Sequence, residues 1–340
     1  MSHHWSSCLT FPSAKFARAQ YPVQLAVRPK PFGLGWRLSE TAIIRKYRGA
    51  LPTYKDGDEQ DTFLFSGEEL VPALVEQDNK WQRARQDVDG YRVDQFRPRH
   101  EGGWQRIERW QDLSTNDVFW RTITIGNVQL WYGYSAESRL SDPENPLRVF
   151  EWKLSHVVDD RGNLIRYRYK RENREEVSPL LSEKCRHTSN CTQLYLKRVW
   201  YGVKTPYKPS DSLPNIDGFL FETVFDYGEH DSQFPTPDEQ ESWSARANPF
   251  SDFRAGFDIR TYRLCERVLL FHRFDELPLS PCLVSATHLT YSSDESGISQ
   301  LSDVVQKGHL WDEETRENVG SSQLYLPTAC LEPRGKVRYR

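Results

Sequence analysis

The sequence predicts a mainly β protein built from many short antiparallel strands and hairpins, with few helices. Apolar and charged residues alternate with period two in many segments, which is the pattern of strands with one buried and one wet face. Aromatic residues form 13% of the 340 residues although the mean hydropathy is −0.73, so large rings supply buried area in a polar chain. No long segment carries apolar residues at the helical spacing i, i+3, i+4, i+7.

The overall totals disfavour several classes of protein. Lys and Arg number 45 against 48 Asp and Glu, a net charge of −3, which argues against nucleic acid as a partner. No apolar run approaches the ~20 residues that a membrane-spanning helix needs. The N-terminus lacks a basic stretch followed by an apolar one, so we predict no standard secretory signal. The six cysteines are irregularly spaced, and we expect free thiols.

The N-terminal part of the chain is predicted to pass from an arm into strands. Residues 1–30 contain scattered prolines and no clean period, which indicates an irregular arm. Pro31–Trp36 is interpreted as a glycine turn that enters a strand around residues 37–45. A further strand is expected at Thr62–Phe65, and residues 70–71 resume the strand pattern.

The next segment contains the first clear hairpin. Residues 76–90 are polar around a single tryptophan and are interpreted as a loop or a short helix. Strands are expected at Tyr91–Phe96 and Arg106–Trp110. From Phe119, the side chains of Trp120, Thr122 and Thr124 share one face, and Gly126-Asn127 forms a two-residue turn before the return strand at Val128–Tyr132.

A second hairpin is equally clear. Apolar side chains alternate with charged or polar ones through Phe150–Ser155 and again through Ile165–Lys170, and the turn residues Asp159–Asn163 lie between them. Periodicity fades after Gly308 into a polar tail, and no internal repeat of fixed period covers the chain. The other predicted elements are loops at 171–192 and 203–217, strands at Leu194–Tyr201, Phe219–Tyr227 and Leu283–Tyr291, and one or two strands within Ile259–Phe274.

The loop containing Cys185, His187 and Cys191 brings two thiols and an imidazole together. A structural zinc site needs four ligands, and only three candidates lie here without a second matching pair. A disulfide between the two cysteines is an alternative, but a plain loop is favoured. We predict no metal site and no cofactor.

Two further motifs are weighed and set aside. Glu68 and Glu69 suggest the acid pair of an ADP-ribosyl transferase, but adjacent residues on a strand point to opposite faces and cannot act together. Gly33 and Gly35 lack the third glycine of a dinucleotide-binding loop, and no helix follows them, so a phosphate site is not expected.

A dense polar cluster follows the predicted strand Phe219–Tyr227. Asp226, Glu229, His230 and Asp231 include the groups that perform acid–base chemistry or bind Ca²⁺. We interpret them as a polar turn at the end of a strand, with hydrolase chemistry as a remote alternative. The prediction is therefore a protein without catalytic residues.

Arginines and aromatic residues alternate in the region of the predicted strands 91–96 and 106–110. Such a set can bind anions, but strands with arginine on the wet face explain it as well. The residues are Arg92, Arg97, Arg99, Arg106 and Arg109, with Phe96, Trp104 and Trp110.

Several sequence motifs, in a fixed order along the chain, resemble the N-terminal module of the SpvB-like family. This family includes the Salmonella virulence-plasmid B protein and the B components of insecticidal Tc toxin complexes. The resemblance extends over roughly residues 31–308. It is carried by Pro31–Trp36, Asp61–Gly67, Phe96–Arg99, Ile107–Trp110, Asp160–Asn163, Tyr195–Val199, Phe225–Asp231, Asn248–Ser251, Phe253–Arg267 and Val304–Gly308.

This resemblance implies a non-enzymatic structural module, part of a curved β shell in the style of RHS or YD-repeat walls. Its partners would be the remainder of a toxin B/C shell and the enclosed payload, with no small-molecule substrate. It also implies a secreted, extracellular protein that is cytoplasmic before release. The expected domains are an irregular arm at 1–30, the module at 31–308 and a divergent tail at 309–340, with no propeller or transferase domain following.

The alternative function is a stand-alone β module that binds carbohydrate or a cell surface. Exposed aromatic side chains such as Trp131 and Trp243 would form its binding face. Their exposure decides whether this alternative is tenable.

Overall fold

The computed structural model describes residues 16–18, 29–34, 36–38, 40–47, 51–56, 61–100, 102–179, 181–186, 191–277, 279–293, 297–311 and 318–325. About 51% of the chain is strand and 4% helix, which confirms the predicted mainly β class. Among the described residues the one α-helix, α1, is a single turn at Leu181–Lys184, and η2 (Ala136–Ser138) and η3 (Ile216–Gly218) are short 3₁₀ turns.

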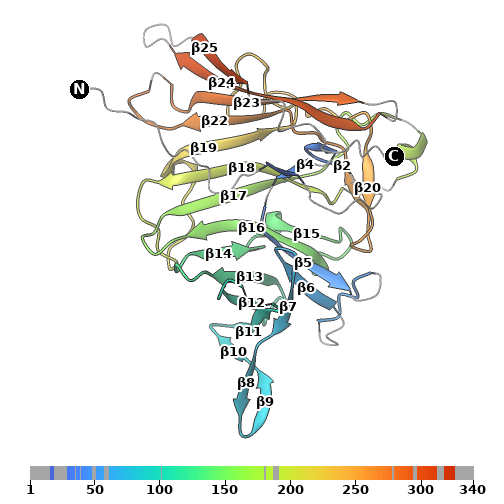
Figure 1. Cartoon of the computed structure of the whole chain (residues 1–340), viewed down its shortest axis with the longest axis vertical. Coiled ribbons are helices and arrows are strands. Elements are labelled where there is room, and N and C mark those ends of the chain that lie inside the picture. Colours follow the sequence, from blue (N-terminus) through green and yellow to red (C-terminus); the bar gives the residue numbers. More distant parts are fainter. Residues whose placement is uncertain are drawn as a thin grey trace, which may run out of the picture.

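The molecule is a ladder of antiparallel strands that cross it and stack along its long axis (Figure 1). Each strand pairs with the next through backbone hydrogen bonds. In spatial order the strands are β10 (Arg85–Val88), β11 (Tyr91–Pro98), β12 (Arg106–Asp112), β13 (Val118–Ile123), β14 (Gln129–Tyr132), β16 (Val149–Val158), β17 (Leu164–Arg171), β18 (Leu194–Val203), β19 (Phe219–Asp226), β22 (Arg267–His272), β23 (Cys282–Ser293), β24 (Ser299–Trp311) and β25 (Asn318–Tyr325).

Strand β16 divides this ladder. Its C-terminal half pairs with β14 and β17, whereas its N-terminal half pairs with β15 (Arg139–Ser141) and β5 (Ala42–Tyr47). From β5 the pairing continues through β6 (Asp61–Phe65) and β7 (Glu68–Pro72) back to β11. Eight strands therefore form a closed ring, in the order β11, β12, β13, β14, β16, β5, β6 and β7. Each strand of the ring is hydrogen-bonded to a neighbour on both sides, so its paired residues present no free edge.

Large aromatic side chains fill this ring. Trp120 and Trp152 are fully buried, with ring centroids 6.0 Å apart and steeply inclined planes. Phe63 contacts both at 4.8 and 5.8 Å. The alternation read from the sequence thus places the correct face of β13 inward, because Trp120 and Thr122 are buried while Arg121 and Ile123 are only partly buried.

A second core lies where residues 227–266, between β19 and β22, fold over one face of the sheet. Buried side chains of β17, β18 and β19 pack here against Tyr227, Trp243 and Ile259 from this excursion. Short pairs complete the layer: β1 (Phe16–Arg18) with β4 (Trp36–Leu38), β2 (Pro29–Lys30) with β3 (Gly33–Leu34), and β20 (Phe250–Asp252) with β21 (Ile259–Thr261).

Gly33 explains the glycine turn at the start of the family resemblance. Its φ is +84°, and a Cβ there would lie 3.1 Å from the Ser299 carbonyl oxygen and 3.2 Å from the Leu301 nitrogen of β24. Only glycine allows this backbone conformation together with such close approach to a strand. The motif is therefore a packing contact rather than a phosphate loop.

Both predicted hairpins are confirmed, with one difference in the turn. The first hairpin has a three-residue loop instead of the two-residue turn expected. Thr124 N–H donates to the Val128 carbonyl, Asn127 N–H donates to the Thr124 carbonyl, and Asn127 has φ +55°. In the second hairpin, Asp159 Oδ1 accepts the N–H groups of Arg161 and Asn163 at 2.9 and 2.8 Å.

Other element predictions need correction. Residues 76–90 are not a loop or helix but contribute β8 (Leu74–Gln77), β9 (Lys80–Arg83) and β10, whose exposed side chains lack the apolar alternation that marks a half-buried strand. The strand expected at 37–45 is divided into β4 and β5. Ile259–Phe274, for which one or two strands were expected, holds two, β21 and β22. Beyond Gly308, β24 continues to Trp311 and pairs with β25. No helix in the described ranges is long and apolar enough to cross a lipid bilayer.

Candidate functional site

The polar cluster after β19 forms around a β-bulge in the neighbouring strand. In the pairing of β17 with β18, Arg168 faces Arg198 and Tyr169 faces Leu196, so Lys197 is an extra residue without a partner in β17. Such a bulge redirects a side chain out of the regular pleat. The Lys197 ammonium consequently reaches the end of β19, where its Nζ donates to the Phe225 carbonyl at 3.0 Å.

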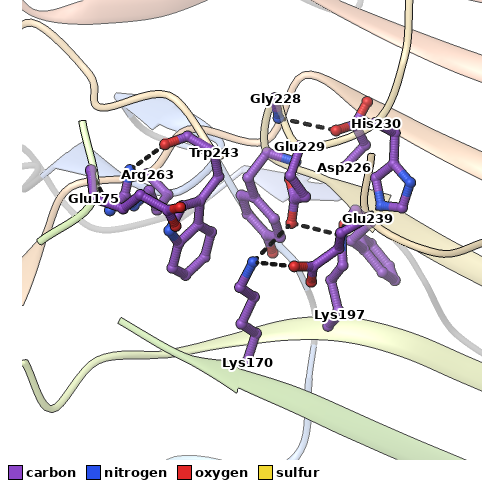
Figure 2. Close-up of polar contacts among 12 residues, drawn as sticks. Lys170, Glu175, Lys197, Asp226, Gly228, Glu229, His230, Glu239, Trp243 and Arg263 are labelled. Carbon is purple, nitrogen blue, oxygen red and sulfur yellow. Dashed lines mark hydrogen bonds and ion pairs between the residues drawn. The ribbon is translucent and has the colours of Figure 1, made fainter. Parts of the chain in front are cut away.

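Lys197 is the hub of the cluster (Figure 2). Its Nζ lies 2.6 Å from Glu229 Oε1 and 2.7 Å from His230 Nε2. The other carboxylate oxygen of Glu229 accepts the Tyr227 N–H at 2.6 Å, and His230 Nδ1 donates to the Thr236 carbonyl at 2.8 Å. Because Nδ1 carries the proton, Nε2 is free to accept from Lys197, and the imidazole is neutral.

Asp226 completes the cluster through a second cation. Its Oδ2 pairs with Arg267 Nε at 2.5 Å, and its Oδ1 accepts the Gly228 N–H at 2.9 Å. Arg267 also donates to the His230 carbonyl at 2.7 Å. Asp226 and Glu229 are completely buried and His230 nearly so, whereas Asp231 sits on the loop and accepts exposed backbone N–H groups. The turn lies where the sequence predicts it, but its burial is not evident from the sequence.

Burial and the neighbouring charges fix the protonation of the cluster. Burial, followed by the positive charge of Lys197, lowers the pKa of His230 below its ordinary value. Burial also lowers the pKa of Lys197, while Glu229 acts in the opposite direction. The lowered pKa of His230 agrees with a neutral imidazole that accepts from Lys197, whereas the charge on Lys197 is opposed by burial and supported by Glu229.

Asp226, Glu229 and His230 place potential metal-ligand atoms within 4.8 Å of one another. That donor set suits a divalent cation in principle. However, the Lys197 ammonium already lies against Glu229 and His230, and the Arg267 guanidinium against Asp226. A metal ion would have to displace two buried cations, so the residues present do not fit a metal site. The cluster acts instead as a clamp between β18, β19 and the start of the excursion.

A second buried network fastens the far side of the same excursion. Arg263, fully buried, donates to Glu172 Oε1 at 2.9 Å and to the Trp243 carbonyl at 2.6 Å. Its guanidinium lies 4.2 Å from the Trp243 ring centroid, and Lys170 Nζ lies 4.0 Å from it. Glu172 Oε2 accepts the Tyr195 hydroxyl at 2.5 Å. Every charge in this network has an opposite charge or a hydrogen-bond partner, as burial requires.

Trp243 therefore cannot serve the binding face suggested as the alternative function. It is completely buried, and its indole N–H donates to Asn173 Oδ1 at 2.7 Å. Trp131 is half-buried and stacks on His156 with ring centroids 5.4 Å apart. The prediction of an exposed aromatic pair at these two positions is wrong for Trp243.

The remaining sequence candidates are dispersed. Glu68 faces His100 at 3.2 Å and Glu69 faces Arg99 at 2.8 Å, so the two acids have separate partners. Cys185 and Cys191 are free thiols in the structure, and His187 lies outside the described residues.

The arginine series is only partly on a wet face. Arg97 and Arg99 are exposed, but Arg109 is buried, with Nη2 2.6 Å from Asp56 Oδ2 and Nη1 3.9 Å from Asp94. Arg45 joins the same group through Asp56, and it also pairs with Asp61 at 3.0 Å. These ion pairs fix β5, β11 and β12 to one another and are not an anion-binding face at Arg109.

Three residues that stabilise the fold through buried ion pairs were not predicted from the sequence: Lys197, Glu172 and Arg263. One signal was available for Lys197. Two adjacent cations, Lys197 and Arg198, interrupt an otherwise apolar strand and break its period-two alternation, which is typical of a bulge.

Comparisons with known proteins show which family shares this sequence and this fold. Residues 26–274 match the family described as SpvB, Salmonella virulence plasmid 65kDa B protein. The mono(ADP-ribosyl)transferase SpvB of Salmonella typhimurium strain 14028s is 37% identical over 279 residues, which cover 78% of this chain and 46% of that protein. The chain thus spans about half the length of the curated relatives it matches.

Solved structures of related proteins show the same fold as this chain. The N-terminal domain of the effector SpvB from Salmonella typhimurium strain LT2 superposes with a TM-score of 0.76 and 30% identity, over 88% of this chain and 98% of that domain. The complex TcdB2-TccC3 without its hypervariable C-terminal region gives a TM-score of 0.74 at 30% identity, over 88% of this chain and 14% of that one. The Photorhabdus luminescens Tc holotoxin pore gives 0.73 with the same coverage. The family resemblance read from the sequence is confirmed: the chain belongs to the SpvB family.

Proposed function

We propose that this chain is a non-enzymatic structural module that forms part of the wall of a toxin assembly. The observation that carries the proposal is its fold, which matches TcdB2-TccC3 over 88% of this chain but only 14% of that one. A module of this shape therefore also occurs as a small part of a much larger toxin component. The proposed partners are the other wall segments and the enclosed payload.

The chemistry of the buried polar groups supports a structural role. In an enzyme, perturbed acids and bases usually face a cleft. Here Glu229 and Arg263 are completely buried, and their charged groups are bonded to buried side chains or to the backbone. The transferase activity named for the relatives belongs to a protein of which this chain matches 46%, so we do not extend it to this chain.

The ends of the ladder support assembly with other wall segments. Within the described residues, β10 pairs with β11 and β25 pairs with β24, each through one edge. An unpaired edge presents N–H and C=O groups that another strand can extend. Accordingly, we place the wall module at residues 31–308, continued by β24 and β25, and propose that it works outside the cell that makes it.

A chimera tests this function directly. The segment of TcdB2 that superposes on this chain is replaced by the chain itself, and co-assembly with TccC3 is followed by size-exclusion chromatography and electron microscopy. A closed assembly of unchanged size is expected. The same chimera carrying Gly133→Ala, which drives a side chain into Trp152, is the matched control and should fail to assemble. Failure of the unmodified chimera, with the segment itself folded, would overturn the proposal.

A transferase assay addresses the non-enzymatic part of the proposal. The chain is incubated with labelled NAD and a cell lysate, beside full-length SpvB as the positive control. Label transfer by SpvB alone is expected. Transfer by this chain, lost on Glu229→Gln but not on Glu68→Gln, would instead assign catalysis to the buried cluster.

A further inference from the structure

A basic groove opens beside the bulge that positions Lys197. It encloses about 530 Å³ between β17, β18, η2 and the loop that follows β19. Five cations line it, against two carboxylates from Glu137 and Glu239, which gives the lining a net charge of +3. The cations are Arg168, Lys170, Arg171, Lys197 and Arg198.

The cations of the groove differ in how far they are already neutralised. Lys197 is held by Glu229, and Arg198 by the buried Glu222 at 3.1 Å. Arg168, in contrast, is exposed, and its side chain has no ion pair or hydrogen bond among the described residues. Arg171 is also exposed, and its guanidinium donates to the Arg139 carbonyl at 3.3 Å. Neither exposed arginine is paired with a carboxylate among the described residues, so the groove keeps uncompensated positive charge.

An acidic loop of the same chain shows which chemistry the groove accepts. This loop, residues 231–242, is named the strap here. Glu239 Oε2 lies 2.7 Å from Lys170 Nζ, and Asp238 Oδ1 lies 3.0 Å from Arg198 Nη2. Figure 2 shows Glu239 and Lys170 facing each other above β17. The Asp238 side chain is 90% exposed and so makes its ion pair in contact with water, where such pairs are weak.

We propose that the basic groove binds a carboxylate-rich peptide segment of a partner chain, and that Asp238 and Glu239 of the strap occupy part of that site in its absence. Guanidinium groups bind carboxylates with two parallel hydrogen bonds, and Arg168 and Arg171 provide two such groups in the lining of the groove. The strap carboxylates pair with Lys170 and Arg198. An incoming acidic segment would exchange places with the strap and gain the two arginines.

A binding measurement on the intact chain tests this inference. The probe is a fluorescein-labelled oligoglutamate peptide, followed by fluorescence anisotropy at low and high salt, with an oligoglutamine peptide of equal length as the neutral reference. Oligoglutamate alone should bind, and its affinity should fall as salt rises. The variant Arg168→Gln should weaken binding roughly threefold to fivefold, as the loss of one exposed ion pair does. Arg97→Gln removes an exposed arginine of β11 outside the groove and should leave the affinity unchanged.

The strap gives a prediction of opposite sign. The double variant Asp238→Asn, Glu239→Gln removes the internal competitor and should tighten oligoglutamate binding roughly threefold. Equal weakening by Arg168→Gln and Arg97→Gln would indicate only general attraction to a polyanion and overturn the inference. Weaker oligoglutamate binding by the strap variant would contradict the inference that the strap competes with an acidic peptide for the groove. These outcomes are independent of the chimera experiment, which requires wall assembly and no ligand in the groove.

Discussion

His156 makes the stability of this module depend on pH in a way that one substitution can isolate. The imidazole is 3% exposed on β16, stacked on Trp131 at 5.4 Å and edge-on to Tyr134 at 5.1 Å. Its Nδ1 has no hydrogen-bond partner. Burial, and then the charge of Arg166 on the adjacent strand, lowers the pKa of His156 to about 3. The folded protein therefore keeps this side chain neutral throughout mildly acidic conditions.

The direction of the effect follows from comparing the two states. In the unfolded chain the histidine has its ordinary pKa of about 6.5 and takes up a proton as the pH falls below that value. The folded chain does not take it up until about pH 3. Acid therefore favours the unfolded state, so the stability that neutral His156 contributes is complete above pH 6.5 and is lost progressively below it.

The size of the effect can be calculated from these pKa values. Each pH unit below the unfolded pKa costs about 1.4 kcal/mol, so moving from pH 7.5 to pH 5 removes about 2 kcal/mol of unfolding free energy through His156 alone. The variant His156→Phe keeps a ring of similar size for the stack but cannot titrate. The free energy of unfolding of both proteins is measured by urea denaturation at the two pH values. The variant should lose about 2 kcal/mol less than the wild-type protein between them.

The other histidines cancel in this comparison, because both proteins contain them. His288, whose pKa burial and neighbouring cations lower to about 4, is one of these shared groups. Parallel losses of stability in wild type and His156→Phe would refute the reasoning, since they would mean that His156 titrates alike in the folded and unfolded states.

Three further predictions follow from the packing. Lys197→Met should cost about 3 kcal/mol in urea denaturation, because it removes the nearer cation of the buried Glu229 and leaves only Lys170, 3.8 Å away. Adding Glu229→Gln should recover part of the loss, and an unchanged midpoint would argue against the clamp. Gly133→Ala should cost about 3 kcal/mol or more, because φ is +62° and the new Cβ would lie 2.2 Å from an indole carbon; a normal melting temperature would contradict this. Maleimide labelling mapped by mass spectrometry should reach exposed Cys185 in the native protein but buried Cys265, whose pKa burial raises, only after unfolding; equal rates would refute the assigned burial.

Local alternation predicted the elements that lie on the main ladder. The hairpins through Trp120 and through Trp152 were evident because each strand has one buried and one wet face, and short turns join the strands. The prediction for residues 76–90 was wrong because this segment has no such alternation. The side chains of β8 and β9 are exposed on both faces, so backbone pairing alone forms them and leaves no apolar pattern.

The buried charges lay beyond the reach of sequence reasoning for a different cause. Glu172 and Arg263 are 91 residues apart in the chain, and no local pattern indicates that they meet. The cluster at Asp226 and Glu229 was found as a motif, but its burial depends on Lys197 arriving from another strand through a bulge. Periodicity describes one strand at a time, whereas these networks depend on pairing between distant strands.

The closed ring also sets an order on folding during synthesis. Arg45 of β5 donates to the carbonyl of Val149, 104 residues later in the chain, and β7 needs β11 as its second neighbour. A ribosome therefore releases the N-terminal strands long before their ring partners exist, and contacts so far apart in sequence form slowly. Until β16 emerges, the edge of β5 is an exposed template for incorrect pairing. A nascent chain of this family should consequently depend on chaperones most strongly while the segment between β7 and β16 is being made.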